Sequence, residues 1–283
     1  MQNNNGLELC MSGGGVWGGS AAGFVAGLYD GGMVPKNICG ISSGNHAAYM
    51  GLSENSPEKI AWIFSEMGNS FGRSFKKSLR TALKIDKLNK KNLSYDDWQE
   101  IEDVWGPIVN YFLGKKHLIE SGVKSFYVGY TDGNGFKFSY KDAMEDSISE
   151  KDVVRLVIQS GMIPFLTMPK FSYNTAFDGG FSRGLFSSGE EGVFRLGVVY
   201  QGGKWSGLSG RGESAMDGIA YIKSPSATPL YAKEDKILEC FWLSYQDGLM
   251  WAKKLKKIGI RSEKSEGHYL EENKERRRLF LVR

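Results

Sequence analysis

Residues 38–51 read ICGISSGNHAAYMG, in which an apolar segment is followed by two serines between glycines and then by small and apolar residues. The apolar segment has the length of a buried strand, and the residues after the serines suit a helix. A sharp turn from strand to helix needs small residues on both sides, which Gly40 and Gly44 supply. The stretch therefore predicts a strand–turn–helix unit with Ser42 at the centre of the pattern Gly-x-Ser-x-Gly.

A similar unit precedes this one. Apolar residues 7–11 end in the glycine cluster SGGGVWGG, and residues 20–32 have the small and apolar composition of a helix closed by glycines. Pro35 then introduces the apolar segment that ends at the serines. The first 52 residues thus predict the order strand, helix, strand, helix, which is typical of a parallel sheet covered by helices.

Further strands and helices are predicted along the chain. Residues 125–140 form two alternating aromatic runs around Asp-Gly-Asn-Gly, which predicts a hairpin. Residues 149–161 begin with a serine cap and end in glycine, as a helix does. Residues 175–184 predict a strand that runs into a glycine turn, and residues 193–200 predict another strand. These elements place the protein in the α/β class.

At 283 residues the chain could form one large α/β domain or two small ones, and its length does not choose between them. Residues 57–122 lack the alternation of strands and are rich in Lys, Trp and Asn, so we interpret them as a helical insertion. From about residue 234 the chain is charged and helical in pattern, which indicates a helical C-terminal extension.

Composition excludes several classes of protein. A content of 41% hydrophobic and 24% charged residues is that of a globular protein, and excludes disordered, collagenous and disulfide-scaffold proteins. The net charge of +4 is modest for 283 residues, so no nucleic-acid partner is expected.

The cysteines and the N-terminus bear on the compartment. Cys10, Cys39 and Cys240 are odd in number and widely spaced, and two of them lie in strand-like segments. We therefore expect buried reduced thiols rather than disulfides or metal ligands. The N-terminus has no basic region followed by an apolar stretch, and no run of about 18 apolar residues occurs. A cytoplasmic location is the expectation.

Gly13, Gly15 and Gly18 match the dinucleotide-binding pattern Gly-x-Gly-x-x-Gly between a strand and a helix. Such a site also needs an acidic residue at the end of the second strand to hold the ribose hydroxyls. Here that strand ends in CGISSG and carries no carboxylate, so the pattern disfavours a nucleotide site.

The same glycines suit an acyl-transfer site. The turn predicted at Ser42 exposes its hydroxyl at a helix N-terminus, where backbone N–H groups favour developing negative charge. Gly13, Gly14 and Gly15 end the neighbouring strand and are able to direct N–H groups at the same place. Ser42 is therefore a candidate nucleophile.

A serine nucleophile needs a base, and the sequence leaves Asp178 and His268 open as candidates. His46 lies one helical turn after Ser42 and suits helix packing, whereas His117 lies in a Lys-rich segment typical of a solvated surface. Ser42, Asp178 and His268 follow the chain order of an α/β-hydrolase triad. Asp178 ends an apolar strand before two glycines, where it could act as base or bind its own turn. If this strand is parallel to the one before Ser42, the two strand ends face the same crevice.

With these residues located, the sequence resembles the patatin-like phospholipase family. The family's glycine-rich turn, serine elbow and Asp-Gly-Gly motif correspond to SGGGVWG, GISSG and FDGG, in the family's order. The segments YVGYTDGNGFKF and VIQSGMIPFLTMP are similar to further family segments, so the likeness extends from Leu7 to Gly184.

The resemblance implies that residues 1–283 form a single catalytic domain, built as a three-layer α/β/α sandwich with a mostly parallel central sheet. It also implies hydrolysis of lipid acyl esters through an acyl-enzyme, without metal or organic cofactor. Ser42 would be the nucleophile and Asp178 the base of a catalytic dyad. Gly13, Gly14, Gly15 and the Ser43 N–H would form the oxyanion hole. Trp17 replaces the basic residue usual in the glycine motif, and the asparagine and proline that often follow the Asp-Gly-Gly are absent.

A basic stripe suggests contact with a lipid surface. On a helix over residues 73–91, apolar side chains would lie opposite basic ones, among them Arg73, Lys77, Arg80 and Lys84. Such a helix is able to meet an anionic membrane, or simply to pack its apolar face on the core. A Ser-His-Asp carboxylesterase and a non-catalytic binding module that keeps the fold remain the alternative functions.

Overall fold

The computed structural model describes residues 6–53, 56–66, 68, 114–132, 137–161, 176–202 and 211–263. The strands are β1 (Leu7–Met11), β2 (Asn37–Ile41), β3 (Ser125–Asp132), β4 (Lys137–Asp142), β5 (Ala176–Asp178), β6 (Phe194–Gln201) and β7 (Gly218–Lys223). The helices are α1 (Gly18–Asp30), α2 (Ser43–Gly51), α5 (Gly114–Ser121), α6 (Glu150–Ser160), α8 (Glu234–Lys257) and one over residues 57–66. Short 3-10 turns are η1 (Gly15–Trp17), η3 (Gly179–Phe181) and η4 (Glu213–Ala215).

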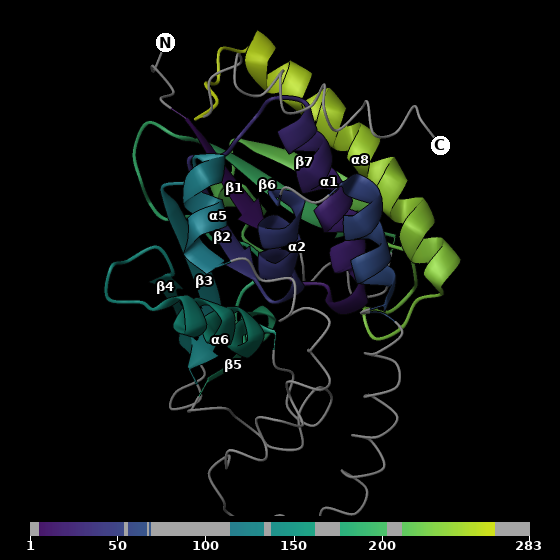
Figure 1. Ribbon diagram of the computed structural model, residues 1–283, viewed down its shortest axis with the longest axis horizontal. Helices are drawn as coiled ribbons and strands as arrows, with labels where there is room; N and C mark the ends of the chain where they lie inside the picture. The colour runs from purple at the N-terminus through teal and green to yellow at the C-terminus, as the bar shows by residue number, and fades with distance from the viewer. Residues whose placement is uncertain are drawn as a thin grey trace, which may run out of the picture.

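The strands form one sheet in the order β4-β3-β2-β1-β6-β7, with β5 paired to β3 (Figure 1). The pairs β1–β2, β1–β6, β2–β3 and β6–β7 are parallel, whereas β4 and β5 run antiparallel to β3. This mostly parallel sheet with helices confirms the predicted α/β class. The two predicted strand–turn–helix units are β1–α1 and β2–α2.

Helices cover one face of the sheet. Every residue of β1 and β2 is buried, which explains why apolar residues lie on both faces of these strands rather than in alternation with exposed polar ones. Leu7 and Leu9 of β1 point into a core that also contains side chains of α1, α2, α5, α6 and α8. In Figure 1 these helices lie in front of and beside the strands.

A different layer covers the opposite face of β1 and β2. Cys10, Cys39, Ile41, Leu185, Phe186 and Val199 form a second buried cluster. Two of these residues come from the segment 182–193, so this irregular connection between η3 and β6 closes the second face within the described residues. Cys240 is buried on α8; all three thiols are buried, as expected, and none forms a disulfide.

α1 and α8 pack at very short range through glycines. A Cβ added to Gly23 would lie 2.2 Å from the Phe241 carbonyl oxygen, and one added to Gly248 would lie 2.1 Å from that of Phe24. Because real Cβ contacts are never this short, larger residues would push the helices apart. The glycines of α1 therefore hold it against α8, and so help to place the glycine turn at its N-terminus.

Two of the predicted features fall largely outside the described residues. These are most of the helical insertion at residues 57–122 and the whole basic stripe of residues 73–91. The predicted helical extension begins, as α8, at Glu234. None of the described helices combines the length and the apolar content needed to cross a lipid bilayer.

Candidate active site

Ser42 stands between β2 and α2 in a strained backbone conformation. Its φ of 54° and ψ of −133° make it the only non-glycine residue with positive φ among those described. Such a conformation costs roughly 1–3 kcal/mol and persists only where the surroundings enforce it. The turn predicted from the sequence is therefore present, with the side chain of Ser42 at the start of α2.

The flanking glycines are required by close contacts. A Cβ at Gly40 would lie 2.1 Å from the Asn45 side-chain oxygen, and one at Gly44 would lie 2.6 Å from the Ser12 carbonyl oxygen. Gly13, at the end of β1, has equally little room, since its added Cβ would lie 2.8 Å from the Cβ of Ser42. The Gly-x-Ser-x-Gly pattern thus lets α2 begin directly against the end of β1.

Asp178 is in direct contact with Ser42. The Ser42 hydroxyl donates to Asp178 Oδ2 at 2.5 Å, and both side chains are buried. The Gly180 N–H donates to Asp178 Oδ1 at 2.6 Å, and the Thr131 hydroxyl donates to the Asp178 carbonyl oxygen at 2.8 Å. The carboxylate therefore binds its own glycine turn through Oδ1 and the serine through Oδ2. Asp178 thus binds its turn, as the sequence suggested, and also contacts the candidate nucleophile.

The strand that carries Asp178 runs in the opposite direction to the one expected from the sequence. The sequence suggested that both residues end parallel strands, but β5 is antiparallel to β3. Ile41 of β2 pairs with Gly129 of β3, and Asp178 pairs with the next residue, Tyr130. β5 thus runs along the same edge of β3 from the opposite direction, and its end meets the end of β2.

Burial changes the acidity of the dyad. Desolvation raises the pKa of Asp178 to about 6, opposed by the hydrogen bonds from Ser42 and Gly180, which stabilise the charged form. A carboxylate with this pKa is mostly ionised at neutral pH and is a stronger base than an exposed aspartate. The arrangement is suited to removing the hydroxyl proton of Ser42.

Ser160, at the end of α6, supports the turn and was assigned no role from the sequence. Its hydroxyl donates to the Gly129 carbonyl oxygen and accepts hydrogen bonds from the Ser42 N–H at 2.9 Å and from Asn45 Nδ2 at 2.8 Å. One buried hydroxyl therefore joins β3, the strained serine and the first turn of α2. The family-like segment VIQSGMIP contains this residue, but its spacing reveals no partner.

Of the predicted oxyanion donors, Gly13, Gly14 and Ser43 lie at the serine turn. Ser43 is the first residue of α2, and N–H groups in a first helical turn have no acceptor within the helix. The Gly14 N–H donates to the Ser43 hydroxyl at 2.9 Å, while Gly13 packs against Ser42. Gly15 has a φ of +53° and starts the 3-10 turn that leads into α1. The oxyanion-hole assignment of Gly13, Gly14, Gly15 and Ser43 stays a prediction.

Trp17, which stands where the family usually has a basic residue, is part of the core. It is buried, its Nε1 donates to the Ser226 hydroxyl at 3.0 Å, and its ring centroid lies 5.4 Å from that of Tyr200. Tyr200 in turn packs against Gly14, where an added Cβ would come within 2.5 Å of the ring. Trp17 thus supports the glycine turn by packing against Tyr200, which contacts Gly14.

The histidines fall into two groups. His46 is buried on α2 with Nδ1 3.3 Å from the Ser42 carbonyl oxygen, and burial lowers its pKa to about 4, so it is neutral near pH 7. It packs in the helix as expected. The side chain of His117 and all of His268 lie outside the part that the structure describes.

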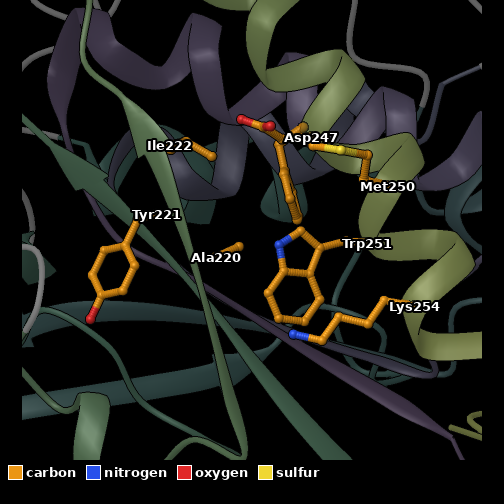
Figure 2. Close-up of a pocket in the computed structure, with 8 residues that line it drawn as sticks. Ala220, Tyr221, Ile222, Asp247, Met250, Trp251 and Lys254 are labelled. Carbon is orange, nitrogen blue, oxygen red and sulfur yellow. The ribbon is translucent and has the colours of Figure 1, made fainter.

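Two other features lie apart from this site. A cavity of about 210 Å³ lies between β7 and α8, and Figure 2 shows the side chains that line it. Lys254 Nζ lies 4.0 Å from the ring centroid of Trp251. Among the described side chains, one group has the composition and spacing of metal ligands, namely Glu8, Cys10 and Cys39. Neither feature includes Ser42 or Asp178.

The fold and the strained serine beside a buried carboxylate define a class of α/β protein with a hydrolase-type serine elbow. The family model described as patatin-like phospholipase matches residues 9–186, and the chain belongs to this family. Patatin-like phospholipases are lipid acyl hydrolases, enzymes of the esterase and lipase kind.

Among solved structures, the chain is similar to VipD from Legionella pneumophila, with a TM-score of 0.48 and 12% sequence identity. That similarity covers 88% of this chain and 67% of the other. A comparison with curated protein sequences found no match.

Proposed function

We propose that the protein cleaves fatty-acyl ester bonds of lipids through a Ser42–Asp178 dyad and an acyl-enzyme intermediate. The observation that carries this proposal is the 2.5 Å hydrogen bond from the Ser42 hydroxyl to a buried Asp178 carboxylate. Membership of a family of lipid acyl hydrolases supports the substrate class. No histidine lies between the two side chains, so the carboxylate can take the proton directly.

The geometry supports a two-step reaction. Asp178 Oδ2 accepts the proton of Ser42 Oγ while the oxygen attacks the ester carbonyl, and the N–H groups of the glycine turn and Ser43 stabilise the oxyanion. Asp178 then returns the proton to the leaving alcohol, which leaves the acyl group on Ser42. A water molecule, activated by the same carboxylate, hydrolyses the acyl-enzyme.

The test combines covalent labelling with hydrolysis of a panel of lipids followed by mass spectrometry. A fluorophosphonate is expected to modify Ser42 alone, since the elbow presents its hydroxyl beside oxyanion donors. Asp178→Asn keeps the shape but cannot accept the proton, so turnover is expected to fall on the order of 10²-fold to 10⁴-fold. His268→Ala is the matched control and should retain activity.

Four outcomes would contradict the proposal. Labelling at Ser43 or another serine would remove Ser42 as nucleophile. Full activity of Asp178→Asn would show that this carboxylate is not the base. Near-complete loss of activity in a folded His268→Ala would favour a Ser-His-Asp esterase. An unlabelled wild-type protein that cleaves no lipid of the panel would indicate a binding module.

A further inference from the structure

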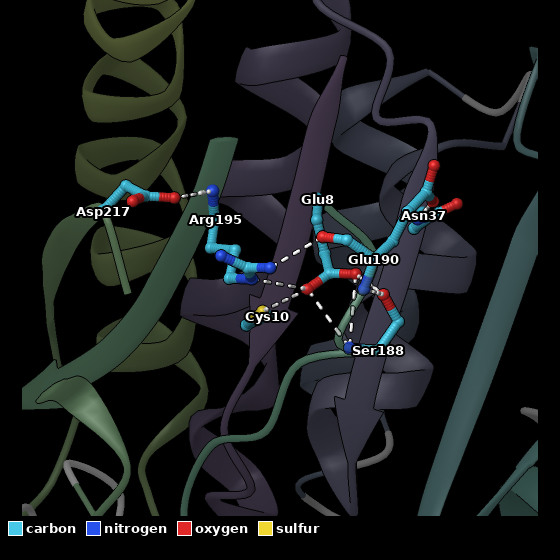
Figure 3. Close-up of polar contacts among 7 residues, drawn as sticks. All are labelled: Glu8, Cys10, Asn37, Ser188, Glu190, Arg195 and Asp217. Atoms are coloured by element: carbon cyan, nitrogen blue, oxygen red, sulfur yellow. Dashed lines mark hydrogen bonds and ion pairs between the residues drawn. The ribbon is translucent and has the colours of Figure 1, made fainter. Parts of the chain in front are cut away.

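A carboxylate and two thiols meet beneath the segment 182–193, on the face of the sheet opposite the helices. Glu8 and Cys10 are two residues apart on β1, so their side chains project from the same face. Cys39 of β2 is the register partner of Cys10, which brings the two thiols side by side. All three side chains have an exposed fraction of 0%. Figure 3 shows Glu8 and Cys10 with the polar residues around them.

The distances within this cluster are close to those of a metal site. One ligand atom from each of the three residues lies within 4.8 Å of the other two, and Cys10 Sγ lies 3.8 Å from Glu8 Oε1. With Zn–S bonds of about 2.3 Å and Zn–O bonds of about 2.0–2.2 Å, tetrahedral angles put two sulfurs about 3.8 Å apart and sulfur and oxygen about 3.5 Å apart. Shifts of under about 1 Å would therefore bring the three atoms around one ion.

The charges around the cluster suit a divalent ion. Arg195 Nε is buried 3.8 Å from Glu8 Oε1 and makes no hydrogen bond within the described part of the chain. Glu8 and Arg195 balance each other while the thiols are neutral. Two thiolates and the Glu8 carboxylate would carry three negative charges, which a divalent ion and the guanidinium cancel. A monovalent ion would leave a net buried charge, which is costly.

We propose that Glu8, Cys10 and Cys39 form a binding site for a thiophilic divalent metal ion, with Zn²⁺ as the best match. On binding, the two S–H bonds break, two metal–sulfur bonds form and two protons pass to solvent, with no change of oxidation state. Glu8 supplies the third bond through Oε1, and a water molecule completes the tetrahedron. Metal binding and the loss of the two thiol protons are therefore coupled.

The surrounding contacts give the ion a structural role. The Ser188 N–H lies 3.2 Å from Glu8 Oε1, and the Ser188 hydroxyl donates to Glu8 Oε2. Glu190, from the same segment, accepts hydrogen bonds from Lys36 and from Asn37 Nδ2. The segment thus closes over the cluster, and a metal would join β1 to β2 beneath it. Glu8 lies near the start of β1, whereas Gly13 and the serine lie beyond its end, so hydrolysis does not require the ion.

The test measures metal content of the purified full chain after incubation with Zn²⁺ and removal of free ion. About one zinc per chain is expected for the wild type by elemental mass spectrometry. Cys10→Ala and Cys39→Ala should lose the bound zinc. Cys240→Ala removes the third buried thiol, which lies on α8, and should keep it.

Cobalt provides a spectroscopic readout of thiolate ligation that the wild type alone can give. Co²⁺ added to the metal-free wild type should give a thiolate-to-cobalt charge-transfer band, and Glu8→Gln, which keeps the side-chain shape, should weaken its formation. A wild type that retains no zinc, or a cobalt spectrum without thiolate bands, would overturn the proposal. Equal zinc in wild type and Cys39→Ala, or loss of zinc in Cys240→Ala, would overturn it as well.

Discussion

At the scale of single residues, the side chains of the proposed dyad are held in states that folding alone would disfavour. Ser42 has a backbone conformation that costs roughly 1–3 kcal/mol. The carboxylate of Asp178 is buried, and this desolvation raises its pKa from 3.8 to about 6. The surroundings compensate through the hydrogen bonds from Ser42 and Gly180. Such strain is common at functional sites, where stability is sacrificed for reactivity.

The raised pKa predicts that Asp178→Asn stabilises the fold above pH 6. Between about pH 4 and 6 the folded protein binds more protons than the unfolded chain, so ionisation of Asp178 lowers stability as the pH rises through that window. An amide avoids this cost; its oxygen can accept from the Gly180 N–H, and its NH2 group can donate to Ser42 Oγ, so a gain of about 1–3 kcal/mol is expected at pH 7. Urea denaturation at pH 7 and pH 4 measures it. A variant less stable than wild type at pH 7 would contradict the pKa.

The same group predicts the pH dependence of hydrolysis. Activity requires the ionised carboxylate, so kcat/KM should fall about tenfold per pH unit below a pKa of about 6. His46, with a pKa lowered to about 4, should not titrate over most of this range. An unperturbed histidine base near pH 6.5 would give a similar profile, so the Asp178→Asn and His268→Ala pair distinguishes the two bases. A flat rate from pH 7 to pH 4.5 would exclude Asp178 as the base.

At the scale of elements, the site is the place where β2, β5 and α6 end beside β3. β2 and β5 both pair with the same edge of β3, and their C-terminal ends meet, which puts Ser42 and Asp178 together. Ser160 at the end of α6 ties this junction to the first turn of α2. The nucleophile is therefore positioned by element ends rather than by a flexible loop.

Ser160→Ala should reduce both stability and turnover. The change leaves the Ser42 N–H, Asn45 Nδ2 and the Gly129 carbonyl oxygen without their partner, at a cost of roughly 2–4 kcal/mol. Misplacement of Ser42 should lower kcat on the order of 10-fold to 10²-fold, with a smaller effect on KM. Thermal denaturation and steady-state kinetics measure the two effects.

The control for that experiment is Ser244→Ala on α8. The Ser244 hydroxyl is equally buried but makes no hydrogen bond in the described part of the chain, so its loss should be neutral or stabilising. Equal effects of the two substitutions, or a Ser160→Ala variant with normal kcat, would show that Ser160 does not position the nucleophile.

At the scale of the whole molecule, one sheet separates two different polar clusters. The Ser42–Asp178 site lies where β1 and β2 end, and the Glu8, Cys10 and Cys39 cluster lies along the same strands on the face covered by residues 182–193. On the other face, α1 and α8 pack through glycines over the length of α1. The same strands thus carry the proposed dyad at their ends and the proposed metal site on one face.

Lipid hydrolysis also requires the whole molecule to meet a lipid surface, and the basic stripe of residues 73–91 is the candidate. Each basic residue near an anionic bilayer contributes about 1 kcal/mol, so replacing Lys77, Arg80 and Lys84 with Gln should weaken vesicle binding on the order of 100-fold. Co-sedimentation with anionic vesicles measures it. Replacing Lys253, Lys256 and Lys257 of α8 with Gln removes the same charge. Equal binding by the two variants would show that the stripe is not the contact.

The local pattern of the sequence was sufficient for most of the described elements and for the turn that carries Ser42, but it did not predict β7. The glycines around Ser42 and the apolar strand before it predict the turn, because a strained conformation between a strand and a helix depends on its immediate neighbours. The same holds for the β3–β4 hairpin and for the Ser149 cap of α6, whose side chain accepts from Asp152 N–H. The motif around Asp178 indicated a candidate base, but only in competition with His268.

The tertiary structure decided which side chains meet. β5 runs antiparallel to β3, contrary to the sequence-based expectation, and this pairing brings Asp178 to Ser42. Ser160 and the pair Cys10 and Cys39 are ordinary positions in the sequence, and acquire partners only through the pairing of distant strands and helices. Desolvation of Asp178 likewise depends on the whole fold. Local preferences act over a few residues, whereas contacts and burial depend on how the entire chain packs.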